Sequence, residues 1–280
     1  MDSAAHKKQA FVDSGQYLRL PDLDADLYFR RSGSGTCLLL ALHGFGLDGS
    51  IFGNIASQID PSTHTLIAPD LPGHGKTNWS ARAFTAQDLV EVVSVLKNMQ
   101  SIDSVHLIGF SYGGRIFTKL VSNGWIPQTR ELTLMAPDGY GGEYTRWIDS
   151  WLGFSLKGVA ALVAYPKPWL WLARILARTK IINPFALQFV EWQLGDPNSR
   201  SRLQLTLRSM GQFRLKKSDY QALNRWAGSA NRASVWLGQR DKVVHANRME
   251  EIVGTMPNVQ WHLHTGGHWP TAEMVKEGFY

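Results

Sequence analysis

Short apolar runs, most of them ending in a loop rich in glycine or proline, recur along the chain and predict buried β-strands. Between several of these runs, apolar residues return at every third or fourth position, the spacing of a helix that packs on a sheet. Strands that alternate with helices in this way predict an α/β fold with a mostly parallel sheet and flanking helices. The predicted strands of that sheet are residues 37–42, 65–69, 105–108, 132–136, 233–238 and 259–264.

The chain opens with a different pattern. Residues 16–20 and 27–31 alternate between apolar and polar side chains, and the stretch Pro21-Asp22-Leu23-Asp24 between them is typical of a turn. Two alternating stretches joined by a turn predict an antiparallel hairpin at the start of the sheet.

Two helix boundaries can be predicted from the sequence. Thr85 is followed three residues later by Asp88, the signature of a capped helix start. Residues 89, 92, 93 and 96 are then apolar at helical spacing. We also expect a short closing helix from residue 271 to the end.

Counting the two strands of the hairpin, residues 132–136 form the sixth predicted strand. The alternation of strands and helices stops after it and returns near residue 231. Residues 140–230 are rich in Trp, Leu, Phe and Arg, and we expect them to be mainly helical, with breaks at Pro166, Pro168, Pro184 and Pro197. A helical insertion between two strands of one sheet is typical of a lid over the strand ends. The expected domains are therefore a core of residues 1–139 and 231–280, and a helical cap of residues 140–230.

The composition is that of an ordinary globular protein, with 44% apolar and 19% charged residues among 280. Cys37 is the only cysteine, which excludes an internal disulfide and a cysteine-based metal site, and we expect neither a metal nor a cofactor. No stretch reaches the roughly 18 apolar residues that span a bilayer. No signal-peptide core follows Met1, so we expect a cytoplasmic protein.

The net charge of +6 is concentrated in one segment. Residues 139–226 hold 13 Lys and Arg against 5 Asp and Glu. We favour a solvated helical surface as the explanation and expect no nucleic-acid partner. Two alternatives stay open. The basic charge could meet an anionic group on a substrate. The cap could also make a weak contact with a membrane surface, because residues 168–174 combine tryptophan, proline, leucine and arginine. The pattern favours no particular oligomeric state.

The candidate chemistry begins at Gly109-Phe110-Ser111-Tyr112-Gly113, a Gly-x-Ser-x-Gly pattern. A strand precedes it, and helically spaced apolar residues follow it. A serine on a sharp turn from strand to helix presents its hydroxyl at the tip of a sheet. The neighbouring glycines give the turn the space that it needs. We therefore interpret Ser111 as a nucleophile.

A serine hydroxyl needs a base within hydrogen-bond reach and an acid that orients the base. On folds with this turn, the three residues follow in the order Ser, Asp or Glu, His. Ser111, Asp241 and His268 have that order, and the last two each follow a predicted strand. Asp138 also follows a strand and stays open as the alternative acid.

These pieces together resemble the α/β-hydrolase family, from about residue 16 to the end. The resemblance is carried by His43-Gly44-Phe45-Gly46, the Ser111 turn, Gly238-Gln239-Arg240-Asp241, Gly267-His268 and the loop from Asp70 to Gly75. It implies a serine esterase with a helical cap, in which the backbone amides of Phe45 and Tyr112 form the oxyanion hole. His43 and His74 are then expected to hold loops. Only 12 residues follow His268, fewer than the closing helix of the family leads us to expect.

The nucleophile limits the reaction. A serine that attacked an epoxide or an alkyl halide would form an ether, which the same base and water would not readily cleave. Acyl chemistry is therefore expected, through an acyl-enzyme, on a small molecule with a hydrophobic part. A carbon–carbon bond hydrolase or a perhydrolase would use the same triad, and a binding protein on this fold would use none of it.

Overall fold

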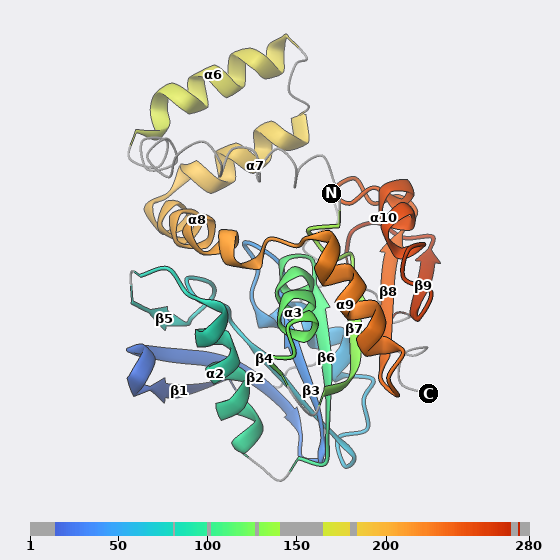
Figure 1. The fold of residues 1–280 in the computed structure, drawn as a ribbon. Coiled ribbons are helices and arrows are strands. Elements are labelled where there is room, and N and C mark those ends of the chain that lie inside the picture. Colours follow the sequence, from blue (N-terminus) through green and yellow to red (C-terminus); the bar gives the residue numbers. More distant parts are fainter. Residues whose placement is uncertain are drawn as a thin grey trace.

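A nine-stranded sheet organises the chain (Figure 1). The computed structural model describes residues 15–80, 82–99, 102–126, 129–140, 165–179, 184–269 and 274. The strands lie in the order β1-β2-β4-β3-β6-β7-β8-β9, and β5 pairs with β2. From β4 to β9 all neighbours are parallel, whereas β1, β2 and β5 pair antiparallel. This is the mostly parallel α/β sheet that the sequence predicts.

The strand bounds agree with the predicted runs to within a few residues. The strands are β1 Gln16–Leu20, β2 Ala25–Gly33, β3 Cys37–Leu42, β4 His64–Pro69, β5 Asn78–Trp79, β6 Ser104–Phe110, β7 Thr129–Met135, β8 Arg232–Gly238 and β9 Val259–His264. The opening hairpin is confirmed, and a 3-10 turn, Pro21–Leu23, joins its strands. Strand β5 was not predicted, because two residues are too few to show an alternation. The sixth predicted strand is therefore the seventh strand of the structure, and the helices that follow it come after β7.

The described helices are α1 Gly53–Ala56, α2 Ala86–Asn98, α3 Tyr112–Ser122, α6 Pro166–Arg178, α7 Pro184–Gly195, α8 Pro197–Met210, α9 Lys217–Ala227 and α10 Ala246–Val253. Helices α2, α3 and α9 lie on one face of the sheet (Figure 1). The predicted start of α2 is confirmed, with Thr85 and Asp88 forming a capping box. Helix α10 was not predicted. The closing helix expected from residue 271 lies outside the described residues.

The core forms because the central strands are covered on both faces. Leu38, Leu39, Leu40 and Ala41 of β3 are all fully buried, and so are Leu107 and Ile108 of the neighbouring β6. Continuous apolar runs of this kind belong to the interior of a parallel sheet. The carboxyl ends of these strands meet at one edge, where the loops are free to carry chemistry.

Helices α6 to α9 lie between β7 and β8 in the sequence, and α6, α7 and α8 lie beyond the carboxyl ends of the strands (Figure 1). Helices begin at three of the four prolines predicted to be breaks, whereas Pro168 does not interrupt α6. Pro166, Pro184 and Pro197 are the first residues of α6, α7 and α8, and Pro168 lies in the first turn of α6. Proline is tolerated there, because the first N–H groups of a helix have no partner within the helix.

Candidate active site

Ser111 occupies a strained turn between β6 and α3. Its backbone angles are φ 49° and ψ −114°, which are uncommon for a residue with a side chain. The turn needs glycine at its neighbours: a Cβ on Gly109 would overlap the backbone of Gly114, and one on Gly113 would overlap the carbonyl oxygen of Leu42. Ser111 N donates to Met135 O over 2.9 Å, which fixes the turn to the end of β7. This is the local geometry that the Gly-x-Ser-x-Gly pattern predicts.

Asp241 and His268 lie together at the ends of β8 and β9. His268 Nδ1 is 2.8 Å from Asp241 Oδ2, and the carboxylate is fully buried. Because Asp241 Oδ1 accepts from the amides of Val243 and Val244, at 2.7 and 2.9 Å, the loop holds the carboxylate in place. With its proton on Nδ1, a neutral His268 offers the lone pair of Nε2 as a base.

His268 also lies beside the serine turn. The rings of His268 and Phe110, the residue before Ser111, have centroids 5.1 Å apart. Trp269 stacks on the same phenyl ring at 6.2 Å. The three residues predicted to form a triad thus come from three neighbouring loops at one edge of the sheet.

Asp138, the alternative acid, has other partners. Its Oδ1 accepts from Arg115 Nη2 over 3.1 Å and from the amide of Gly139 over 2.7 Å. Arg115 is almost fully buried, so its charge requires an acid nearby. The amide of Asp138 donates to Ser111 O over 3.0 Å. Asp138 therefore contacts the serine turn through its backbone and an arginine through its side chain.

The loop that contains Phe45 adjoins Ser111. A Cβ on Gly44 would lie 3.1 Å from Cβ of Ser111, so residue 44 passes directly beside the serine. Tyr112 is the first residue of α3, where backbone amides point away from the helix. The two amides predicted to form an oxyanion hole thus belong to segments that flank Ser111.

His43 fixes this loop, as the sequence led us to expect. The amide of Leu71 donates to His43 Nε2 over 2.9 Å, so His43 Nδ1 carries the proton and donates to Gly44 O over 2.8 Å. Burial lowers the pKa of His43, which keeps the ring neutral as these two bonds require.

His74 holds the adjoining loop. Its Nδ1 lies 3.0 Å from Pro72 O, and its ring packs edge-on to Phe45 at 5.6 Å. Burial, together with nearby His43, lowers the pKa of His74 well below its ordinary value. Both imidazoles are therefore uncharged supports of the loops around Ser111.

Asp70 is a supporting residue whose role was not predicted from the sequence, although its loop was noted. Its buried carboxylate accepts from Arg30 Nη1, from the amide of Gly49 and from the amide of Lys76, each at 2.8 Å. A Cβ on Gly75 would overlap this carboxylate. An aspartate at the end of a buried strand could have indicated a supporting role. Its partner Arg30 lies forty residues earlier in the sequence, so the contact could not be predicted.

Helices α7 and α8 rest on the loops beside Ser111. A Cβ on Gly46 would overlap the ring of Trp192 of α7, and one on Gly73 would lie 2.7 Å from Leu205 of α8. Gln193 follows Trp192 and is buried near Gly46, and neither atom of its side-chain amide has a hydrogen-bond partner within the described part of the chain. None of these three side chains was singled out from the sequence.

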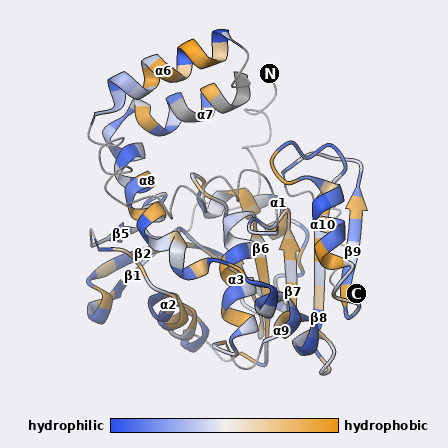
Figure 2. Cartoon of the chain, turned by 45° about the horizontal axis from the view of Figure 1, so that its top comes forward, coloured by the Kyte–Doolittle hydropathy of each residue, from blue (hydrophilic) through white to orange (hydrophobic). Residues whose placement is uncertain are grey.

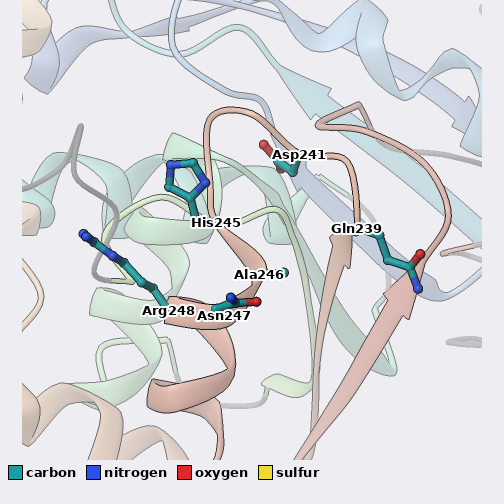
Figure 3. Close-up of a pocket in the computed structure, with 6 residues that line it drawn as sticks. All are labelled: Gln239, Asp241, His245, Ala246, Asn247 and Arg248. Carbon is teal, nitrogen blue, oxygen red and sulfur yellow. The ribbon is translucent and has the colours of Figure 1, made fainter.

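A cleft of about 400 Å³ opens on the loop that carries Asp241 and the start of α10 (Figure 3). It is lined by Gln239, Asp241, His245, Ala246, Asn247 and Arg248. Within the described ranges, no three His, Cys, Asp or Glu side chains gather closely enough to hold a metal ion.

Parts of the sequence are similar to proteins of known function. Over 135 residues the chain is 29% identical to the dihydrolipoyllysine-residue acetyltransferase component of the acetoin cleaving system of Cupriavidus necator, covering 46% of this chain and 34% of that protein. Over 97 residues it is 33% identical to the pimeloyl-[acyl-carrier protein] methyl ester esterase of Citrobacter koseri, covering 34% of this chain and 35% of that protein. The chain thus spans about a third of the length of these curated relatives.

Among solved structures, a carboxylesterase from the thaumarchaeon Nitrososphaera gargenis superposes with a TM-score of 0.63 at 18% identity, covering 94% of each chain. This likeness shows a shared fold. The sequence pattern described as "Alpha/beta hydrolase family" matches residues 38–278, which include the turn of Ser111 and the loops of Asp241 and His268. The chain therefore belongs to the alpha/beta hydrolase family.

Proposed function

We propose that this protein is a serine hydrolase that cleaves an ester or a related acyl bond of a hydrophobic small molecule. The observation that carries the proposal is the 2.8 Å contact between His268 and the buried carboxylate of Asp241, beside a serine held at φ 49°. A base oriented by a buried acid, next to a strained serine turn, is the arrangement that makes a serine hydroxyl nucleophilic.

In the proposed reaction, Ser111 Oγ attacks the acyl carbon while His268 Nε2 takes the hydroxyl proton. The amides of Phe45 and Tyr112 donate to the oxygen that becomes negative. His268 then gives its proton to the leaving alcohol, and an ester between Ser111 and the acyl group remains. Water, deprotonated by His268, attacks this ester, which releases the acid and restores the serine. Asp241 orients His268 and stabilises its charged form throughout.

The acid of the proposed triad is Asp241. Its carboxylate contacts His268, whereas the carboxylate of Asp138 accepts from Arg115 and Gly139. An Asp138 side chain that turned to His268 would leave the nearly fully buried Arg115 without this charge partner, at a considerable cost in stability.

We propose that residues 140–230 act as the lid of the site. Trp192 lies against Gly46, on the loop beside Ser111, and Leu205 lies against Gly73, on the adjoining loop that His74 holds. These apolar contacts support a substrate with a hydrophobic part. The buried amide of Gln193 beside them supports a polar group on the same substrate, since a buried amide is costly without a partner. The relative named as a methyl ester esterase supports an ester as the bond that is cleaved.

Labelling with a fluorophosphonate probe tests the proposal, because this probe reacts with activated serines. We expect the native chain to be labelled and the Ser111→Ala variant not to be. Ser57→Ala is the matched control, because Ser57 is exposed and donates to Asn54 O far from this turn, and it should label like the native chain. A folded native chain without labelling would contradict the proposal and favour a binding protein.

Once labelling is established, p-nitrophenyl esters of graded acyl length identify the preferred acyl group. A chain that is labelled but cleaves no ester would direct attention to carbon–carbon bonds beside a ketone or to perhydrolysis, which use the same residues.

A further inference from the structure

Helix α6 presents large apolar side chains to solvent. Only Ala173 of this helix is buried. Tyr165 is 72% exposed, Trp171 65%, Leu172 39% and Trp169 37%. The helix packs on α7, and it lies farther from the sheet than α7 and α8 do (Figures 1 and 2). An isolated exposed side chain needs no explanation, but four neighbours of this size do.

The exposed apolar residues lie on more than one side of the helix. Trp169 and Leu172 are three residues apart and share one side, and Tyr165 immediately precedes the first turn. Ala173, which is buried, lies four residues after Trp169 and therefore borders that side. Trp171 is about 100° of helix rotation away from Leu172 and lies on a different, more exposed side.

A basic stripe runs along the same side of the helix as Trp171. Lys167 and Arg178 are exposed and eleven residues apart, close to three full helical turns, so they lie on the same side. Arg174 lies between them and donates to Glu191 of α7 over 2.8 Å, which neutralises part of its charge. Residues 165–179 contain no acidic residue. Lys167 lies four residues before Trp171, and Arg178 lies seven after it, so one free face of α6 combines an exposed tryptophan with basic side chains.

We propose that α6 binds the surface of an anionic lipid bilayer, lying parallel to it. Tryptophan and tyrosine prefer the boundary between headgroups and acyl chains, and each basic side chain gains from the negative surface potential. A second copy of this chain is a poorer occupant, because a two-fold contact would set the cationic stripe against itself. The inference does not depend on the proposed hydrolysis, since its measurement is binding.

Vesicle flotation with the full chain tests this. We expect the native chain to float with vesicles of phosphatidylglycerol and phosphatidylcholine, and to float much less with pure phosphatidylcholine. Binding should also weaken as the salt rises from about 0.1 M to about 1 M, where screening is strong. Equal flotation with both lipids, or no flotation with either, would overturn the proposal.

Two variants locate the contact on α6. Lys167→Glu with Arg178→Glu should reduce binding by at least about 25-fold, from roughly fivefold for each basic charge lost. Trp169→Ser with Trp171→Ser should reduce it by at least about tenfold, through lost apolar burial. All these residues are exposed, so melting curves should match the native curve. Undiminished flotation of both double variants would refute the assignment to α6.

Trp125→Ser is the matched control. Trp125 is 41% exposed and follows the C-terminal end of α3, at the opposite end of the sheet, so its loss should leave flotation unchanged. Size-exclusion chromatography tests the alternative that a second copy of this chain binds α6. A native dimer that the Trp169/Trp171 variant converts to a monomer, without lipid binding by either, would show self-association and overturn the proposal.

Discussion

Trp192 of α7 lies against Gly46 so closely that a Cβ on this glycine would overlap the indole ring. Gly46 has φ 76° and follows Phe45, whose amide is one of the two proposed oxyanion donors. Arg202 of α8 lies over the same indole at 5.2 Å. The loop of Phe45 and Gly46, beside the nucleophile, is thus held in its position by α7, a helix that comes much later in the sequence.

We expect Gly46→Ala to lower kcat on a p-nitrophenyl ester by roughly 100-fold, the size of effect that a displacement of about 1 Å has in an active site. The added methyl group must move either the indole of Trp192 or the loop of Phe45. Gly124→Ala is the matched control, because Gly124 has a similar φ of 68° and open space where the methyl would go.

Both variants carry the same backbone strain, about 1–2 kcal/mol, so both should melt somewhat earlier. Only Gly46→Ala should lose activity. Equal kcat values for the two variants would show that the contact with Trp192 does not shape the site.

Asp241→Asn should lower kcat by about 10⁴-fold, because an amide no longer orients His268 or balances its charge. The fold should survive, since the asparagine oxygen can still accept from Val243 and Val244. Asp138→Asn provides the comparison. It should retain most of its kcat but lose about 3 kcal/mol of unfolding free energy, because Arg115 is buried beside it. A large loss of kcat in Asp138→Asn, together with a nearly unchanged kcat in Asp241→Asn, would make Asp138 the acid. Urea unfolding measures the stability of both variants.

The sequence favoured Asp241 as the acid but left Asp138 open, because both aspartates follow a buried strand. What distinguishes them is the neighbour of each carboxylate, His268 or Arg115, and those neighbours are set by packing. The turn of Ser111, in contrast, is specified locally, by a strand, glycines and a helix within one stretch. Its existence and its position could therefore be predicted from the pattern alone.

Contacts between segments that are distant in the sequence could not be predicted from the pattern. Trp192 lies within the Trp-rich segment of residues 140–230, and nothing near it in the sequence points to Gly46. Strand β5 and helix α10 were missed for a different reason, since they are too short to show a clear period. The long, periodic elements and the chemistry at their ends were the predictable part.

Asp70→Asn should destabilise the protein by about 3 kcal/mol, because the fully buried carboxylate is the partner of Arg30 and of two amides. An asparagine offers one oxygen in place of two and removes the charge. Asp24→Asn is the control, because Asp24 pairs with Arg19 in solvent and should cost less than about 1 kcal/mol. Urea unfolding of both variants measures the difference, and equal losses would refute the role of Asp70.

Stability should fall as the pH falls below the ordinary pKa of histidine, near 6.5. Burial lowers the pKa of His43 and of His74 in the folded chain, so the unfolded chain binds more protons in this range. Each such imidazole reduces the unfolding free energy by about 1.4 kcal/mol for every pH unit below that value, until the folded-state pKa is reached. Protonation of His43 would also break its bond from Leu71.

The variant His74→Asn tests this, because the asparagine amide can still donate to Pro72 O but does not titrate. Urea unfolding between about pH 7 and pH 5 should show an average slope that is smaller than the native slope by about 1 kcal/mol per pH unit. Identical slopes for the native chain and His74→Asn would mean that His74 takes up its proton without unfolding the protein.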